Sequence, residues 1–547
     1  MLILLTSIVL FRPTNLVFYQ KLSIVNKRES SLARSAGSVS GATAVSRVLG
    51  LVREQVMAFY FGAGIATDAF IAAYRIPNIL RDMFAEGALS SAFVPVFKQK
   101  IVNDSETEAR SLANTVATLI LLLVGLIVLL GIIAAPAIVY ISANGFTSDP
   151  LKFDLTVNLT RIMMVYLLLV SLSSLAMGML NSYGKFAIPA ISPALFNLGI
   201  VLTVLICHRF FEEPVFALAI GVVVGGIAQL AIQLPALFKT GYRFYPSLNF
   251  LDEGMKRIFK LFAPMVVGLS AGRVNILVST LLASFLAEGA LSYLNYSFRI
   301  MHFPLGVFAV ALGTVALPKV SELVARKDFD NLNKTFQQAI GLNFFIVIPS
   351  AVVLALVAPM IIKSIFQWGA FGEIDTSKAS LALMHYSYGL VGFAVVRVVV
   401  PFYYAFGDSR LPMRVSIVTV AANLLLYYPL ILVLDFAGLA AATSLAGLLN
   451  ATLLLVFLST KPIEINWGRL LLNLFRVTLA AILAFYLAKI TQFNFSQIEF
   501  EALKRAAQLI SILSIGGVAY FIFCLIFRVS EAVKIGKWIL KIIFRKQ

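Results

Sequence analysis

Long apolar segments separated by short polar ones make up most of the chain. About fourteen segments stay apolar over roughly 20 residues, the length that a helix needs to cross a hydrocarbon core of about 30 Å. The pattern therefore predicts an all-α polytopic membrane protein with about 14 transmembrane helices. The predicted spans are 36–62, 66–98, 111–141, 155–183, 187–207, 214–238, 257–286, 289–318, 336–363, 378–405, 411–434, 436–459, 467–488 and 504–527.

Landmark residues recur about 225 positions apart, which indicates an internal repeat. Spans 1–6 and 7–12 are therefore expected to be two copies of one six-helix unit. Because six is even, both copies start on the same side of the membrane, related by a pseudo-twofold axis along its normal. The matching landmarks are Tyr74-Arg75-Ile76 with Phe298-Arg299-Ile300, Gly64 with Gly289, Pro77 with Pro304, Pro95 with Pro318, and Gly184 and Pro189 with Gly407 and Pro412.

This repeat predicts the domain organisation, in which spans 13 and 14 are an appended pair. Residues 1–35 contain an apolar run that is too short to span a membrane and a basic approach to the first span. A cytoplasmic tail and an over-extended start of translation explain this segment equally well, and the tail is the interpretation adopted. The predicted parts are the tail 1–35, an N-lobe at 36–238, an interlobe linker at 239–256, a C-lobe at 257–460, the pair at 461–527 and a basic amphipathic tail at 528–547.

Composition supports the membrane assignment, and charge orients the chain. The sequence is 60% hydrophobic and 13% charged, with a mean hydropathy of +0.93, well above the range of soluble domains. Most of the 44 Lys and Arg residues fall in the two tails and in the loops on the same side of the membrane. Both termini are therefore expected to be cytoplasmic. The net charge of +18 then needs no nucleic-acid partner.

Charged residues inside the predicted spans are the main candidates for function. Arginines outnumber acids at this depth, and buried charge without a protein partner favours an anionic ligand. The planar guanidinium binds phosphate oxygens with two parallel hydrogen bonds, so a phosphate or diphosphate is expected. An ion pair of Arg81 with Asp82 or Glu86, and a pair of Arg53 across helices, are the alternatives. The arginines concerned are Arg47, Arg53, Arg75, Arg81, Arg161, Arg273, Arg299, Arg397 and Arg476, of which Arg47, Arg53, Arg81 and Arg299 are the first choices.

Glycine and proline are concentrated in the first helix pair of each repeat. Pro77, Pro304, Gly62 and Gly64 are predicted hinges, because proline frees a carbonyl and glycine permits bending. Close helix packing explains the same residues equally well.

Motifs of enzymes and metal sites are not found in the sequence. It has no phosphate-binding G-x-x-x-x-G-K-[ST], no H-E-x-x-H and no G-x-S-x-G, and its two cysteines lie far apart. We therefore expect a transporter without a cofactor, driven by a monovalent ion gradient, by the membrane potential or by coupled metabolism.

Four stretches of the sequence stand out as motifs: SRVLGLVRE, GAGIATDAFIAAYRIPNILRDMFAEGALSSAFVPVF, FRIMHFPLGVFAVALGTVALP and AFGDSRLPM. They resemble the MurJ (MviN) lipid II flippase family of the multidrug/oligosaccharidyl-lipid/polysaccharide exporter superfamily. The resemblance runs from about Ala36 to the end of span 14. It implies a bacterial inner-membrane protein with a cationic central cavity for the diphosphate of lipid II and a groove of spans 13 and 14 for its polyprenyl tail. The residues it implies for substrate binding are Arg47, Arg53, Arg81 and Arg299, with Ser46, Asp68 and Glu86.

The sequence also departs from this family. Phe298 replaces an acidic residue, and Ser279 and Tyr427 stand where some relatives have sodium-binding carboxylates. Only the neutral Asn423 and Thr443 of such a site are retained, and neutral ligands bind a hard cation weakly. The resemblance thus leaves sodium coupling doubtful.

The resulting hypothesis is a lipid II flippase that works by alternating access. Its expected partners are lipid II and the membrane, its expected state is a monomer, and cell-wall synthesis proteins are candidate further partners. The alternatives are a flippase for another polyprenyl-diphosphate oligosaccharide and a non-transporting membrane scaffold. A cation exporter is disfavoured, because it would need carboxylates in its cavity.

Overall fold

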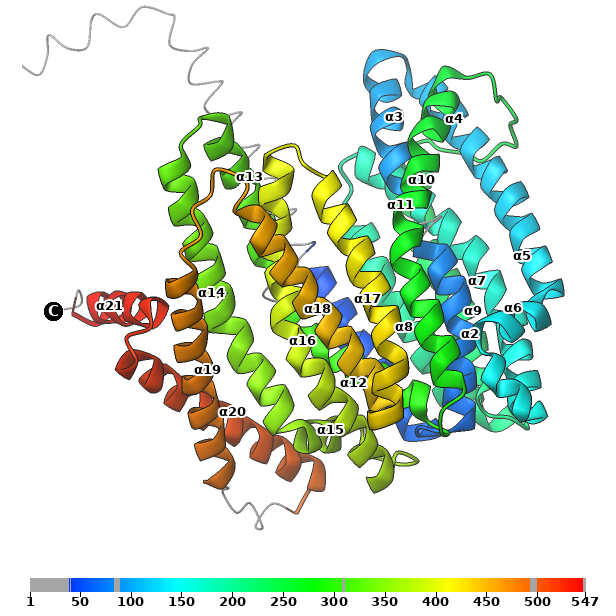
Figure 1. The fold of residues 1–547 in the computed structure, drawn as a ribbon. Coiled ribbons are helices and arrows are strands. Elements are labelled where there is room, and N and C mark those ends of the chain that lie inside the picture. Colours follow the sequence, from blue (N-terminus) through cyan, green and yellow to red (C-terminus); the bar gives the residue numbers. More distant parts are fainter. Residues whose placement is uncertain (1–38, 40, 83–88, 307–309, 492–498, 545–547) are drawn as a thin grey trace, which may run out of the picture. The chain divides into compact units, whose positions relative to one another are not determined.

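The computed structural model describes residues 39, 41–82, 89–306, 310–491 and 499–544, and every regular element in these ranges is a helix (Figure 1). The predicted all-α class is therefore confirmed. Residues 41–61 are helical. The further helices are α2 (Ile65–Arg81), α3 (Ser90–Asn103), α4 (Glu106–Leu119), the π-helix η2 (Ile120–Val124), α5 (Gly125–Ile133), α6 (Ala135–Ser142), η3 (Asn144–Ser148), α7 (Pro150–Ser182), α8 (Ala187–Cys207), η4 (His208–Phe210), α9 (Phe216–Ala231), α10 (Leu234–Phe238), α11 (Glu253–Ser284), α12 (Ala290–Pro304), α13 (Val310–Ala325), α14 (Phe329–Leu356), α15 (Ala358–Phe366), α16 (Glu373–Ala405), α17 (Arg410–Leu434), α18 (Ala437–Leu458), α19 (Trp467–Ile490), α20 (Glu501–Ile526) and α21 (Ser530–Phe544).

Ten helices in the described ranges are long and apolar enough to cross a membrane, which makes this a multi-span membrane protein. They coincide with predicted spans 3–6 and 9–14. The other four predicted spans fall on helix 41–61, on α2 with α3, on α11, and on α12 with α13. These helices are shorter than the ten candidate spans or carry more charged residues than they do. The total of fourteen spans stays a prediction. The ten begin at Glu106, Pro150, Ala187, Phe216, Phe329, Glu373, Arg410, Ala437, Trp467 and Glu501.

Local sequence signals set several helix ends. The Ser105 side chain accepts a hydrogen bond from the Glu108 amide at the start of α4, as an N-cap does. Gly184 ends α7 and Gly407 ends α16, both with positive φ, at 75° and 72°. Glycine is favoured there because it has no Cβ to clash in the left-handed region. These two glycines are a pair in the sequence repeat, and they have the same role in the two places.

The chain forms two compact units, each described here by itself. Their boundaries pass through helices and differ from those of the six-helix lobes, which remain a prediction. The first unit comprises the described residues up to Arg53, Leu80–Leu130 and Ile162–Val266; the second comprises Glu54–Ile79, Gly131–Arg161 and the described residues from Val267 onward.

In the first unit, the connector after α10 is held by an ion pair outside the spans. Lys100 Nζ, near the end of α3, lies 2.6 Å from Asp252 Oδ2, just before α11. Partial burial would raise the pKa of the Asp252 carboxyl. Hydrogen bonds from Lys100 and from the Met255 amide outweigh burial, so this pKa is lowered. The connector is thereby tied to α3.

The lowered pKa predicts a pH-dependent effect of replacing Asp252. Its stabilising contribution should be fully present above the unfolded pKa near 4 and be lost as pH falls through the lower folded pKa. Asp252→Asn should therefore reduce the melting temperature at pH 7 and pH 5, and the difference from the unaltered protein should shrink below pH 4. Thermal unfolding in detergent measures this. Glu253→Gln, at an exposed neighbour, is the control; an Asp252→Asn effect independent of pH would contradict the assignment.

In the second unit, α14, α16, α19 and α20 share a hydrophobic core. Phe336 and Phe402 meet edge to face with ring centroids 5.4 Å apart, and Cys524 is fully buried in the same cluster. The Tyr520 hydroxyl donates a 2.7 Å hydrogen bond to the Phe345 carbonyl. This core joins α19 and α20, which have no counterpart in the repeat, to the helices before them.

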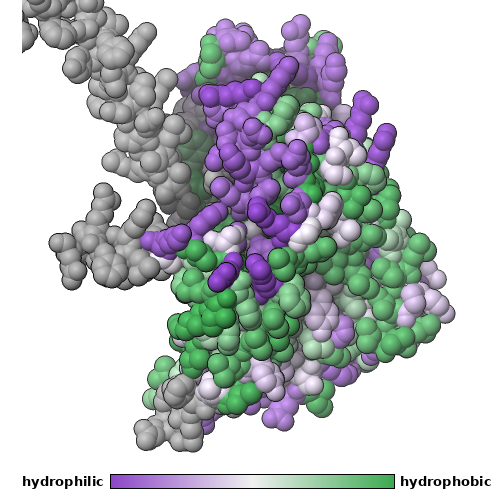
Figure 2. Space-filling view, turned by 60° about the vertical axis from the view of Figure 1, so that its left-hand side comes forward, coloured by the Kyte–Doolittle hydropathy of each residue, from purple (hydrophilic) through white to green (hydrophobic). Residues whose placement is uncertain are grey.

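The outer surface of the second unit is apolar over much of its area. Figure 2 shows a broad hydrophobic area below a concentration of hydrophilic side chains. Large apolar side chains on α19 and α20 are more than half exposed, among them Phe475, Ile490, Ile510 and Val518. In water such a surface would be costly, whereas lipid chains can cover it. The surface therefore agrees with a membrane environment.

Because α16 packs closely on α18, we expect replacement of Gly392 by a larger residue to destabilise the protein. A Cβ added at Gly392 would lie 2.6 Å from the backbone of Gly447, so Gly392→Ala must push the two helices apart. Overpacking of this kind costs about 1–3 kcal/mol, more than alanine's gain in helix propensity of about 1 kcal/mol. We expect a lower melting temperature in detergent. Gly517→Ala on α20 is the matched control and should be neutral or stabilising, because an added Cβ there would meet no atom of another described helix within 4 Å.

Candidate functional site

Arg299 of α12 forms an ion pair with a buried carboxylate in the second unit. Its Nε lies 3.2 Å from Glu54 Oε1, and the Asn295 amide lies 3.4 Å from the other oxygen, Oε2. The Glu54 side chain is 3% exposed, but that of Arg299 is 47% exposed. The carboxylate therefore fixes one edge of a guanidinium that still has solvent-exposed surface. Such an arrangement can hold an anion bidentately.

Arg75 of α2, the repeat counterpart of Arg299, is anchored in the same unit. Its guanidinium donates to Thr280 Oγ1 on α11, and its side chain is half-buried. The sequence analysis included Arg75 among the span arginines but not among its first choices. The pairing of Arg75 with Arg299 in the sequence repeat was the signal that could have placed Arg75 among the first choices.

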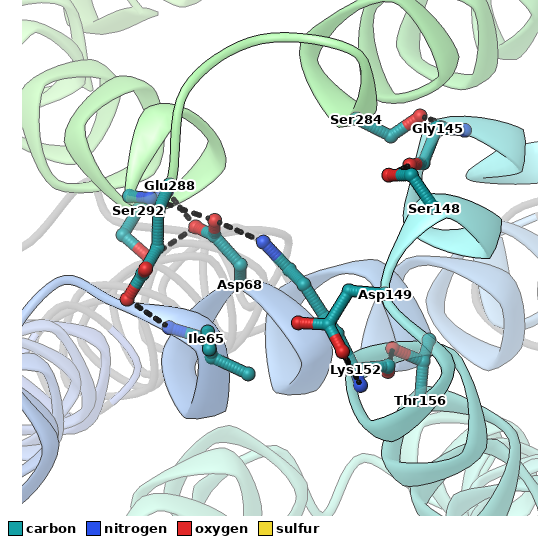
Figure 3. Close-up of polar contacts among 11 residues, drawn as sticks. Ile65, Asp68, Gly145, Ser148, Asp149, Lys152, Thr156, Ser284, Glu288 and Ser292 are labelled. Atoms are coloured by element: carbon teal, nitrogen blue, oxygen red, sulfur yellow. Dashed lines mark hydrogen bonds and ion pairs between the residues drawn. The ribbon is translucent and has the colours of Figure 1, made fainter.

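Asp68, in the first turn of α2, is the centre of a buried polar network (Figure 3). Its Oδ2 accepts hydrogen bonds from Lys152 Nζ at 3.0 Å and from the Gly289 amide at 2.9 Å. Its Oδ1 accepts from the Ser292 amide at 3.0 Å and from the Ser292 hydroxyl at 2.7 Å. Asp68 and Lys152 are both buried, and each requires the other as charge partner. The structure thus favours a positioning role for Asp68, whereas the sequence analysis placed it among the substrate-binding residues.

The starts of α2 and α12 cap each other. Asp68 of α2 accepts from the first amides of α12, and Glu288, just before α12, accepts a 3.1 Å bond from the Ile65 amide at the start of α2. Helix N-termini carry unpaired amides and partial positive charge, so both carboxylates are stabilising there. We call this arrangement of Asp68, Lys152, Glu288 and Ser292 the Asp68 latch.

Tight backbone approach explains the glycines beside the latch. Gly289 has φ of 84°, and a Cβ there would lie 2.7 Å from the Ala63 carbonyl. Gly62 has φ of 61°, and its carbonyl accepts a 3.2 Å bond from the Tyr296 hydroxyl. A Cβ at Gly64 would lie 2.9 Å from Glu288 Oε1. Close approach therefore accounts for these glycines in this arrangement, and their predicted hinge role, like that of Pro77 and Pro304, stays a prediction.

The other three first-choice arginines, Arg47, Arg53 and Arg81, belong to the first unit. Arg81 pairs with Asp82 at 2.9 Å, one of the alternatives that the sequence left open. The side chain of Arg47 is exposed and that of Arg53 is partly buried. The Ser46 carbonyl accepts a 3.3 Å bond from the Asn197 amide. Glu86 lies outside the described residues, and the convergence of Arg47, Arg53 and Arg81 with Arg299 on one ligand stays a prediction.

The weak sodium candidates sit in a neutral hydrogen-bonded group of the second unit. Asn423 Nδ2 and the Tyr427 hydroxyl each donate to Asn275 Oδ1 at 2.9 Å. Thr443 donates to the Leu439 carbonyl of its own helix, and the buried Asn423 Oδ1 has no hydrogen-bond partner among the described residues. Within the described ranges, no group of three or more His, Cys, Asp or Glu could hold a metal ion. The ligand atoms in this group are neutral, and neutral oxygens bind a hard cation more weakly than carboxylates do.

Comparison with known proteins places these observations in a family. Residues 57–504 match the family model described as lipid II flippase MurJ. The chain is 34% identical over 437 residues to the lipid II flippase MurJ of Burkholderia cenocepacia, covering 79% of this chain and 85% of the relative. It is 36% identical over 437 residues to a probable lipid II flippase MurJ of Vibrio cholerae, covering 79% and 83%.

Solved structures agree with the sequence relatives. A structure of lipid II flippase MurJ in an inward closed conformation matches with a TM-score of 0.75 and 28% identity, covering 90% of this chain and 98% of that one. An inward-facing multidrug resistance MATE family transporter of the MOP superfamily matches with a TM-score of 0.59 and 13% identity, covering 78% and 94%. This second likeness shows a shared fold alone. With a family match over most of its length and several relatives above 30% identity, the chain belongs to the lipid II flippase MurJ family.

Proposed function

We propose that this protein is a lipid II flippase of the bacterial inner membrane. It moves the undecaprenyl-diphosphate-linked peptidoglycan precursor from the cytoplasmic to the periplasmic leaflet, and it is a transporter rather than an enzyme. The observation that carries the proposal is the Arg299–Glu54 pair, within a chain that belongs to this family. It supplies a half-exposed guanidinium, held by a buried carboxylate, inside an otherwise apolar protein.

Arginine chemistry suits the diphosphate of such a cargo. The guanidinium stays charged when desolvated and offers a planar fork of donors to phosphate oxygens. In our proposal Arg47, Arg53 and Arg81 complete the diphosphate site with Arg299. Arg81 releases Asp82 when it binds the ligand. Alternating access then carries the head group across, while the polyprenyl tail stays in lipid along α19 and α20.

The topology and energy source are part of the same proposal. Both termini lie in the cytoplasm, as the excess of Lys and Arg on one side predicts. Transport is driven by the membrane potential or by a monovalent ion. The neutral setting of Asn423 and Thr443 favours the membrane potential over a sodium site there.

Binding of the purified protein to defined lipids tests the cargo. We expect lipid II to bind more tightly than undecaprenyl diphosphate carrying an unrelated oligosaccharide, with both competing for one site. Equal binding of the two lipids would favour the broader polyprenyl-diphosphate specificity. Binding of neither lipid, with protein that is monodisperse in detergent, would overturn the proposed function.

A further inference from the structure

A cavity of about 920 Å³ lies among α15, α16, α19 and α20 of the second unit. Lys363, Lys378 and Lys489 line it from α15, α16 and α19. Gln508 and Ser511 of α20 add polar groups to the same lining. We call it the lysine pocket. None of its residues belongs to the Asp68 latch or to the arginines proposed for the diphosphate.

The lysine pocket lies where membrane-spanning helices end. Candidate spans end at Leu356 and Ile490, and others begin at Glu373 and Glu501, so four helix ends surround it. In Figure 1, α15 lies beside α20 at this end of the helices, and the two helices are in contact. A cavity at this level faces the boundary between hydrocarbon and water, where lipid headgroups reside.

Positive charge dominates the lysine pocket. Glu373 is the acidic residue of its lining. In the part of the chain that the structure describes, none of the three ammonium groups lies within 4.0 Å of a carboxylate. Lys489 Nζ lies 3.3 Å from the Leu356 carbonyl, and Lys378 Nζ lies 5.7 Å from the centroid of the Tyr293 ring. Three lysines facing one lining carboxylate in a partly enclosed space leave an excess of positive charge, which attracts anions.

The helix surfaces beside the lysine pocket are apolar. Tyr486 and Ile490 at the end of α19 are 57% and 65% exposed, and Leu503 and Ile510 near the start of α20 are 58% and 62% exposed. In a ligand that joins an anionic group to hydrocarbon chains, the anionic group would lie among the lysines and the hydrocarbon chains would lie on these apolar surfaces. A soluble anion would contact the lysines but would leave the apolar surfaces beside them uncovered.

From this geometry, we propose that the lysine pocket binds the phosphate-bearing headgroup of an anionic phospholipid from the surrounding bilayer. The volume lies in the range of small-ligand sites, and lysines near a membrane surface attract anionic lipids. The bound lipid bridges α15 and α16 to α19 and α20 through its phosphate. The proposal does not depend on the transported cargo.

Native mass spectrometry of the full chain in detergent tests the proposal with three probes: phosphatidylglycerol, zwitterionic phosphatidylethanolamine and undecaprenyl diphosphate. We expect phosphatidylglycerol to be retained at higher collision energy than phosphatidylethanolamine. Replacing Lys363, Lys378 and Lys489 together with Gln should weaken phosphatidylglycerol binding on the order of 100-fold, since each lysine near the surface contributes roughly a fivefold step. The Lys→Arg triple variant should retain the lipid, because it keeps the charge.

A matched control removes the same charge elsewhere at the membrane boundary. Lys319 on α13, Lys327 between α13 and α14, and Lys334 on α14 are exposed. Changing all three to Gln should leave phosphatidylglycerol binding unaltered. Equal losses in the control and the pocket variant would overturn the proposal, as would equal retention of phosphatidylglycerol and phosphatidylethanolamine. Retention of undecaprenyl diphosphate alone in the lysine pocket would also overturn it, by assigning the pocket to the cargo. If the Gln variant unfolds, the Lys→Arg triple variant still tests the proposal. Failure of the folded Arg variant to bind phosphatidylglycerol would contradict a charge-based site.

Discussion

Replacing Arg299 with alanine is expected to abolish lipid II transport. The change removes a guanidinium proposed to hold the diphosphate, and it also breaks the ion pair that Arg299 makes with the buried Glu54 carboxylate. Breaking a fully buried pair on one side costs about 3–5 kcal/mol, and the cost here should be smaller because Arg299 is half exposed. The protein should therefore be less stable as well as inactive. Transport is measured as lipid II exposed at the outer face of cells depleted of their own flippase.

A double variant separates ligand binding from folding. Glu54→Gln with Arg299→Gln removes both charges of the pair, so stability should recover relative to Arg299→Gln alone. Transport should stay lost, because the guanidinium is absent. Normal transport by the double variant, at normal protein levels, would show that Arg299 serves only as the partner of Glu54. Arg326→Gln, at an exposed i,i+4 pair with Glu322, is the control for losing an ion-paired arginine and should transport normally.

Replacing Asp68 with alanine is expected to be the most destabilising single change in the second unit. It strands the Lys152 ammonium in a buried position and leaves the Gly289 and Ser292 amides without their acceptor. The loss of a buried charge partner alone costs about 3–5 kcal/mol, and the lost cap about 1 kcal/mol more. We expect low protein levels and a melting temperature in detergent far below that of the unaltered protein.

The Asp68 latch has a matched control on α7. Asp149 Oδ1 also accepts backbone amides, those of Leu151 and Lys152, but Asp149 is only partly buried. Asp149→Ala should cost about 1 kcal/mol, as the loss of an ordinary cap does. Asp68→Ala combined with Lys152→Ala should be less destabilised than the sum of the two single changes. Additive effects, or a larger effect at Asp149 than at Asp68, would contradict the latch.

Much of the architecture follows from local pattern. Apolar runs of about 20 residues predict helices at the places where the structure has them, because a backbone in hydrocarbon must satisfy its own hydrogen bonds. Gly184 and Gly407 could be paired from spacing alone, and both end a helix with positive φ. The tail after 528 was predicted as an amphipathic helix, and α21 is helical from Ser530 to Phe544.

The candidate site is less predictable, because charge partners are chosen by packing between distant segments. The sequence favoured Arg299 as a ligand residue, but its pairing with Glu54 joins residues far apart in the chain. Lys152 lies in a predicted loop and was not among the candidate residues, yet it is the buried partner of Asp68. No periodicity or motif connects Lys363, Lys378 and Lys489, which only the folding of α15, α16 and α19 brings to one cavity.

The sequence by itself determined that this is an all-helical, multi-span membrane protein with more arginines than acids in its spans, since hydropathy and residue type are local properties. Its motifs also carried the family resemblance. The tertiary structure alone decided which charges are satisfied: Asp68 is enclosed by α12 and Lys152, whereas Arg299 is anchored by Glu54 and remains half exposed. The physical reason is that the burial of a charge and its partner depend on contacts between segments far apart along the chain.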